Sequence, residues 1–158
     1  MASEKYRNRS RDVSIPLTLS EIKLYLPNFG IKRLVEIIWI ASQNNDRLYK
    51  TLMGAVGIEL ANGNLKKAKQ AIDYALDLPD YVKYNEHGYG IILDELKTSL
   101  EHLLNSSCNK KFILELAKYI VDKSQHLIEN FDDGWDWICS LERFEEWLQK
   151  IAPELSSL

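Results

Sequence analysis

The sequence predicts an all-α protein, with six or seven antiparallel helices stacked as an irregular helical-repeat (α-solenoid-like) array or as a bundle. Three observations predict this fold. Apolar residues recur at helical spacing in one segment after another. Capping residues and short turns separate these segments. No stretch alternates between apolar and polar residues for long enough to form a sheet.

The clearest helix is predicted over residues 109–130. Asn109 is a suitable N-cap, because its side chain can accept a hydrogen bond from a free amide of the first turn. Asp132-Asp133-Gly134 follows as a stop signal. The helix is about 30 Å long, and its apolar stripe must be buried by helices on both sides of it in sequence. The stripe contains one polar residue, Ser124, among Phe112, Ile113, Leu116, Ala117, Ile120, Leu127 and Ile128.

Three helices are predicted in the first part of the chain. Thr18-Leu19-Ser20-Glu21 has the form of a capping box, so a short helix should begin there and end before Pro27. The next two helices are predicted over residues 31–42 and 47–60. Gly54 and Gly57 share one face of the second of these, which favours close helix packing over a ligand contact. The helix over residues 31–42 is expected to bury Leu34, Val35, Ile38 and Trp39.

Three more helices complete the expected array. They are predicted over residues 65–78, from about residues 84–87 to 104, and over residues 135–150. The short turns between helices favour antiparallel neighbours.

Length and composition indicate one domain over residues 15–158, after a flexible basic tail at residues 1–14. The chain has 158 residues, close to the commonest domain size. Its net charge of −3 gives no overall field to attract nucleic acid or an acidic membrane surface. The longest apolar stretch, residues 34–41, is too short to span a bilayer. Without a signal-peptide pattern, the expected location is the cytoplasm.

No pattern in the sequence indicates a catalytic, cofactor or metal site. His87, His102 and His126 do not have the spacing of metal ligands. A calcium loop with Gly134 at its sixth position would place Ser140 at the twelfth, where a carboxylate is required. We therefore expect no catalytic residue, no cofactor and no bound metal.

Aromatic residues near one end of the helical array form the candidate interaction surface. Two interpretations stand for the tryptophans, packing between helices and an exposed aromatic patch. The residues of this candidate surface are Trp135, Trp137, Trp147, Tyr81 and Tyr84.

Five segments carry a family resemblance: Tyr81-Val82-Lys83-Tyr84, Gly90-Ile91-Ile92-Leu93-Asp94-Glu95-Leu96, Ile113-Leu114-Glu115-Leu116-Ala117-Lys118-Tyr119, Asp132-Asp133-Gly134-Trp135 and Leu141-Glu142-Arg143-Phe144. This pattern, within about residues 45–150, resembles the C-terminal helical region of bacterial SWIM zinc-finger family proteins. That family joins a Cys-x-Cys…Cys-x-His zinc module to a helical-repeat tail. Cys108 and Cys139 cannot build the zinc motif, so the resemblance implies a helical-repeat fold and an adaptor role without zinc.

These observations favour a non-enzymatic scaffold or adaptor that mediates protein–protein interaction. The partner is expected to be another protein, and a homo-oligomer stays open. The alternative is a nucleic-acid-associated accessory protein that uses the basic arm Lys5, Arg7, Arg9 and Arg11. The modest charge of this arm and the acidic segment 129–146 count against the alternative. An enzyme would require carboxylates such as Glu59, Asp94 and Asp133 to converge in a pocket.

Overall fold

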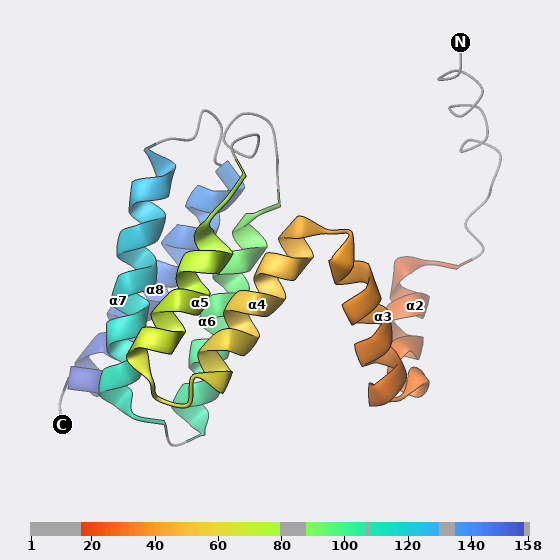
Figure 1. Ribbon diagram of the computed structural model, residues 1–158, viewed down its shortest axis with the longest axis horizontal. Coiled ribbons are helices and arrows are strands. Elements are labelled where there is room, and N and C mark those ends of the chain that lie inside the picture. Colours follow the sequence, from red (N-terminus) through yellow and green to blue (C-terminus); the bar gives the residue numbers. More distant parts are fainter. Residues whose placement is uncertain (1–16, 80–87, 107, 130–134, 157–158) are drawn as a thin grey trace, which may run out of the picture. The chain divides into compact units, whose positions relative to one another are not determined.

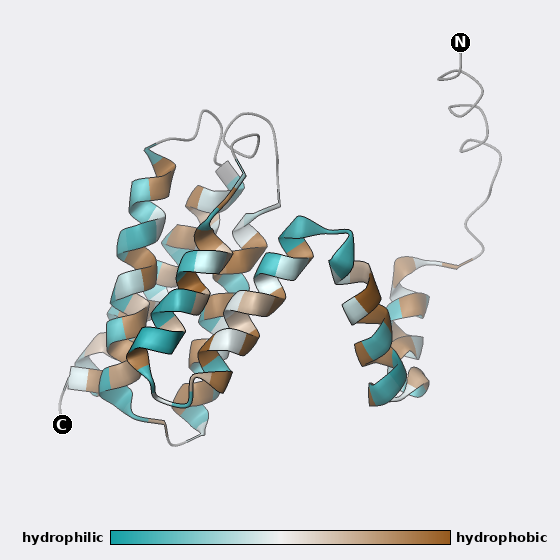
Figure 2. Ribbon diagram, viewed as in Figure 1, coloured by the Kyte–Doolittle hydropathy of each residue, from teal (hydrophilic) through white to brown (hydrophobic). Residues whose placement is uncertain are grey.

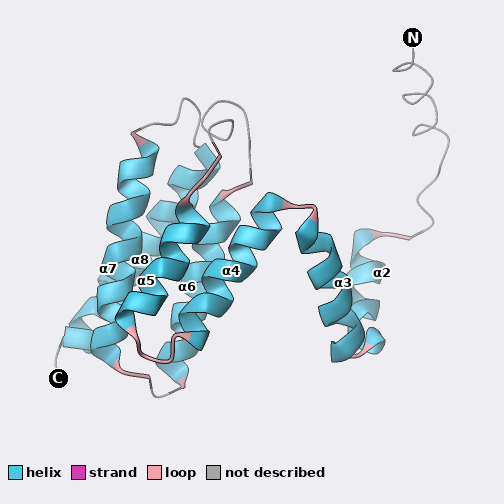
Figure 3. Ribbon diagram, in the orientation of Figure 1, coloured by secondary structure: helices cyan, strands magenta, loops and turns pink. Residues whose placement is uncertain are grey.

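The computed structural model of the protein describes residues 17–79, 88–106, 108–129 and 135–156. These residues form seven α-helices and one 3-10 helix, with no strand among them (Figure 3). The predicted all-α class is therefore confirmed. The helices are α2 (Leu19–Tyr25), η1 (Leu26–Phe29), α3 (Ile31–Gln43), α4 (Asp46–Leu60), α5 (Leu65–Leu76), α6 (Gly90–Asn105), α7 (Lys110–Ile128) and α8 (Trp135–Ser156).

Contacts divide the chain into two compact units, Met1–Ala41 and Ser42–Leu158, where the sequence predicts one helical domain over residues 15–158. The predicted basic tail at residues 1–14 lies outside the described residues. Every buried hydrophobic residue in the described part of the chain belongs to the second unit, between Ile58 and Leu155. The hydrophobic core therefore lies in the second unit.

The second unit consists of two layers of helices (Figure 1). Helices α4, α6 and α8 run in one direction, with α4 packed on α6 and α6 packed on α8. Helices α5 and α7 run in the opposite direction and pack on each other. The layers meet where α5 packs along α4, and where α7 packs along α6 and α8. Helices joined by short turns are thus antiparallel neighbours, as the sequence predicts.

Helix α7 contacts three other helices, α5, α6 and α8. It begins after Asn109, whose Oδ1 accepts a hydrogen bond from the Lys111 amide at 2.9 Å. The predicted stripe is confirmed from Phe112 to its polar member Ser124, and its last two residues, Leu127 and Ile128, are partly buried. The buried residues of α7 are Phe112, Ile113, Leu116, Ala117, Ile120 and Ser124.

Two glycines let α4 approach its neighbours closely. A Cβ atom at Gly54 would lie 2.7 Å from the Cβ of Ala75 on α5 and 2.9 Å from a methyl carbon of Leu96 on α6. A Cβ atom at Gly57 would lie 2.5 Å from the Cβ of Ala71 on α5. Real Cβ atoms do not approach this closely, so the prediction of close helix packing at both glycines is confirmed.

Helix α8 continues to Ser156, beyond the predicted end at residue 150. Pro153 lies inside it and cannot donate a backbone hydrogen bond, which normally destabilises a helix interior. Ile151 and Leu155 are both buried in the core on either side of Pro153. Apolar burial therefore extends the helix past its predicted end.

Candidate functional site

The described part of the first unit contains a capping box that fixes the start of α2. The Glu21 amide donates to Thr18 Oγ1 at 3.2 Å, and the Thr18 amide donates to Glu21 Oε2 at 2.7 Å. These hydrogen bonds lower the pKa of the Glu21 carboxyl group. Helix α2 ends before Pro27, as predicted, and Gly30 turns the chain into α3 at a φ of 77°. Glycine adopts this left-handed conformation without strain.

Helix α3 has apolar residues around most of its circumference. Ile31, Val35 and Ile38 form one stripe, with intervals of four and three residues. Ile37 and Ile40 lie elsewhere on the helix, and Figure 2 shows how hydrophobic residues recur along α3. An ordinary surface helix has one apolar stripe about 100° wide. This helix therefore has more apolar surface than one neighbour can cover.

The predicted buried side of α3 is exposed. Val35 is 58% exposed, Ile38 44% and Trp39 54%, and the prediction is wrong for these three residues. Leu34 is half-buried. The physical reason is the shortness of α2 and η1, which have seven and four residues and contain no buried side chain.

Most of the exposed large hydrophobic residues in the described part of the chain belong to the first unit. Twelve exposed large hydrophobic residues lie there, and we call them the α2–α3 surface: Leu17, Leu19, Ile22, Leu24, Tyr25, Leu26, Ile31, Val35, Ile37, Ile38, Trp39 and Ile40. The much larger second unit has five among its described residues: Met53, Val56, Leu60, Tyr74 and Ile91. Soluble monomers rarely expose a contiguous apolar patch of more than a few hundred Å². Twelve exposed large hydrophobic residues among the 25 described residues of the first unit are an unusual concentration, which gives the α2–α3 surface the character of an interaction surface.

An apolar hollow of about 310 Å³ forms part of the α2–α3 surface. It is framed by two aromatic rings, Tyr25 and Phe29, which pack edge to face with their centroids 6.2 Å apart. The guanidinium carbon of Arg33 lies 4.1 Å from the centroid of Phe29 and covers that ring. The hollow is lined by Leu17, Glu21, Ile22, Tyr25, Leu26 and Phe29.

The tryptophans of the predicted interaction surface lie on α8. Trp137 is only 1% exposed and donates from Nε1 to the Ser124 carbonyl at 3.3 Å, so the packing interpretation is confirmed for Trp137, and its inclusion in the candidate interaction surface is corrected. Its ring fills the core between α7 and α8. Trp147 is half-buried and packs edge to face on Phe144 at 5.5 Å. Trp135 is the first residue of α8, and Tyr81 and Tyr84 lie outside the described residues.

A polar cluster joins α5 to α7. Asp73 accepts hydrogen bonds from the Tyr119 hydroxyl and from the Lys123 ammonium group. Desolvation opposes ionisation of Asp73, but the two hydrogen bonds and the charges of Lys123 and Lys69 outweigh it and lower its pKa. The hydrogen bond to Asp73 and desolvation raise the pKa of Tyr119. Both shifts stabilise the ionised aspartate and the neutral tyrosine, which suits a structural link between the helices.

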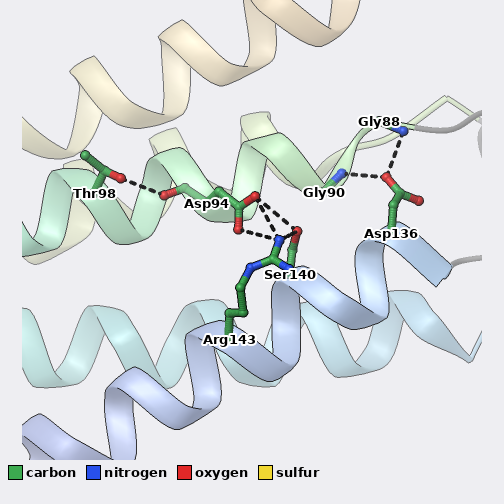
Figure 4. A network of polar contacts seen from close by, with 7 residues as sticks. All are labelled: Gly88, Gly90, Asp94, Thr98, Asp136, Ser140 and Arg143. Carbon is green, nitrogen blue, oxygen red and sulfur yellow. Dashed lines mark hydrogen bonds and ion pairs between the residues drawn. The ribbon is translucent and has the colours of Figure 1, made fainter.

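A second polar network joins α6 to α8 (Figure 4). Asp136 Oδ2 accepts hydrogen bonds from the amides of Gly88 at 2.8 Å and Gly90 at 3.1 Å, so α8 caps the start of α6. One turn further along α6, Asp94 accepts from Arg143 at 3.2 Å and from the Ser140 hydroxyl at 3.3 Å. The sequence places the start of α6 near residues 84–87, which lie outside the described residues. The described helix begins at Gly90.

These polar groups do not assemble into a recognisable catalytic or metal site. Asp94 is paired with Arg143, and Glu59 contacts His102 and the Ser99 hydroxyl. Among the described residues, no three His, Cys, Asp or Glu side chains come close enough together to hold a metal ion. Asp133 lies outside the described residues, so the predicted carboxylate set is not described as a whole.

Part of the α2–α3 surface was not predicted from the sequence. Ile31, Ile37 and Ile40 belong to this surface and are exposed, but none of them was predicted as a functional residue. The available signal was the width of the apolar face of α3, which exceeds one stripe.

No described helix has both the length and the apolar character needed to cross a membrane. The basic arm from Lys5 to Arg11 lies outside the described residues. Comparison with known proteins finds no matching family model, no matching curated protein and no matching solved structure.

Proposed function

We propose that this protein is a non-enzymatic helical scaffold or adaptor that binds another protein chain through the α2–α3 surface. The observation that carries the proposal is the concentration of exposed apolar residues in the first unit. Twelve large hydrophobic residues between Leu17 and Ile40 are exposed, although this unit contributes only 25 of the described residues. Covering such a surface is the usual source of binding free energy in protein association.

The second unit supplies a rigid support for this surface. Its core is continuous from Ile58 to Leu155, and polar networks at Asp73 and Asp94 fix the relative positions of its helices. We interpret the hairpins α4–α5 and α6–α7, followed by α8, as a degenerate helical repeat, in line with the SWIM-family resemblance. A scaffold of this kind would act in the cytoplasm.

Site-specific photo-cross-linking in the native cell tests the proposal. A photoreactive phenylalanine in place of Ile38 should give a covalent adduct with a second protein chain, because Ile38 belongs to the exposed stripe of α3. The same amino acid in place of Lys118, which is exposed on α7, serves as the matched control.

An adduct at position 38, together with none at position 118, would support the proposal. Equal adducts at both positions would indicate collision rather than binding. The absence of an adduct at position 38 under conditions that label a known complex would contradict the proposal.

A further inference from the structure

We infer that the partner of the α2–α3 surface is a second copy of this chain, so that the protein is a homodimer held together by antiparallel pairing of α3. This inference rests on the proposed function and names the occupant of the same surface. Four observations carry it: the missing core, the area, the spacing of the apolar residues and the charge balance.

The described part of the first unit, residues 17–41, has too few helices to enclose a core. It is one hairpin, with α2 and η1 on one side and α3 on the other, and it contains no buried hydrophobic residue. Units of about 40 residues usually need disulfides, metals or oligomerisation to be stable. Two copies of the hairpin supply four helices, which is the smallest common bundle that encloses an apolar core.

The exposed area also suits a dimer. If each of the twelve residues of the α2–α3 surface exposes on the order of 100 Å², the surface amounts to about 1,200 Å². A standard protein interface buries about 800 Å² on each partner. The α2–α3 surface as a whole therefore exceeds the area that one partner of a standard interface buries, so a two-fold interface needs only part of it.

The apolar spacing on α3 is typical of helices that pair with each other. Ile31, Val35 and Ile38 are separated by four and three residues, the intervals of the a and d positions in coiled coils. A two-fold axis makes each copy contact the same residues of the other, so one stripe serves both sides of the interface. Val35 of one copy would pack near Ile38 of its partner.

Charge sets the direction of pairing. Lys32 and Arg33 both lie near the start of α3, and its first turn contains no acidic residue. Parallel pairing would bring these basic residues of the two copies together, together with the positive ends of two helix dipoles. Antiparallel pairing separates them. The described part of the unit has three basic residues, Lys23, Lys32 and Arg33, and two acidic residues, Glu21 and Glu36, so repulsion between copies is small.

Light scattering after size exclusion, supported by sedimentation equilibrium, tests the inference with the full chain at micromolar concentration. The wild-type chain should have twice the mass of one 18.3 kDa copy. Ile38→Glu should weaken dimerisation by at least about 100-fold, because it places an unpaired carboxylate in the apolar interface. Ile91→Glu is the matched control, since Ile91 is an isoleucine of α6 that is as exposed as Ile38 but lies outside the α2–α3 surface, and this variant should stay dimeric.

Circular dichroism and urea unfolding of both variants show whether the second unit stays folded. A wild-type chain that is monomeric at every concentration would overturn the inference. So would an Ile38→Glu variant that dimerises as well as Ile91→Glu.

The mass of the photo-cross-linked adduct separates this inference from the proposed function. An adduct of twice the chain mass supports the homodimer. An adduct with a different protein at position 38 would support the proposed function and overturn the homodimer.

Discussion

Apolar residues recur at helical spacing in both units of this protein, but they are buried in the second unit and exposed in the first. In α7 the apolar stripe is buried on three neighbouring helices. In α3 the residues at the same helical spacing are exposed, although this helix is at least as hydrophobic. Amphipathic periodicity therefore identifies the surface that a helix must cover, and it does not identify the molecule that covers it.

The largest expected effect is in the core around α7. Leu116→Ala and Ile120→Ala should each lower the free energy of unfolding by about 2–5 kcal/mol, through lost burial and the cavity that remains. Both side chains are fully buried in the second unit. Urea unfolding measures the change.

Lys118→Ala, on the exposed side of the same helix, should change the free energy of unfolding by less than about 0.5 kcal/mol. Similar midpoints for all three variants would show that the stripe is not the core of the folded chain.

The next largest loss of stability is expected where α4 packs closely on α5 and α6 at Gly54. Gly54→Ala should destabilise the second unit by about 1–3 kcal/mol, because the new methyl group overlaps Ala75 and Leu96. The gain in helix propensity, about 1 kcal/mol, opposes this loss without removing it. Thermal unfolding followed by circular dichroism at 222 nm provides the measurement.

Gly30→Ala is the counterpart in the first unit, where φ is 77° and no heavy atom lies within 4 Å of the added Cβ atom. Alanine at position 30 strains the backbone of the first unit alone, so the main unfolding transition, which is that of the second unit, should stay unchanged. A stabilised Gly54→Ala variant would contradict the close approach of α4 to α5.

Acid should weaken the link between α5 and α7. The pKa of Asp73 is lowered in the folded protein, so its contribution to stability is complete above the unfolded-state pKa and is lost as the pH falls through the folded-state pKa. Because Asp73 is partly exposed, the contribution should be at most about 1 kcal/mol.

Urea unfolding at neutral pH and at acidic pH should show this loss for the wild-type chain. Asp73→Asn should show a smaller difference between the two pH values. An identical pH dependence in both chains would mean that the aspartate is not ion-paired in solution.

The smallest effect is expected in α3. Ile40→Ala makes the same chemical change as Ile120→Ala but at a side chain that is 67% exposed. It should change the free energy of unfolding of the second unit by less than about 0.5 kcal/mol. Urea unfolding of these two isoleucine variants side by side compares the units directly. A loss at Ile40 as large as that at Ile120 would show that α3 is part of the core.

The start of α7 and its buried stripe were predictable because they depend on local information. Asn109 caps the helix within its own first turn, and Leu116 and Ile120 repeat at helical intervals. The end of α8 was less predictable, because Pro153 is a local stop signal that Ile151 and Leu155 override through tertiary contacts.

The candidate site was the least predictable part of the molecule. The sequence is compatible with either packing or exposure for Trp137, and in the structure its indole lies against the carbonyl of Ser124 in the core. Apolar residues recur at the same helical spacing around Trp137, which is buried, and around Val35, which is exposed. Only the position of neighbouring helices distinguishes these outcomes.

The cap that Asp136 places on α6 couples the hydrogen exchange of two amides to local unfolding at the start of α8. The amides of Gly88 and Gly90 bond to a carboxylate that lies 48 and 46 residues further along the chain. A helix start with a local cap can fray and reform without help from the rest of the protein. Here, any excursion that detaches the start of α8 also releases these amides to exchange with solvent deuterium. Their exchange rates would therefore report the docking of α8, even though both amides belong to another part of the chain.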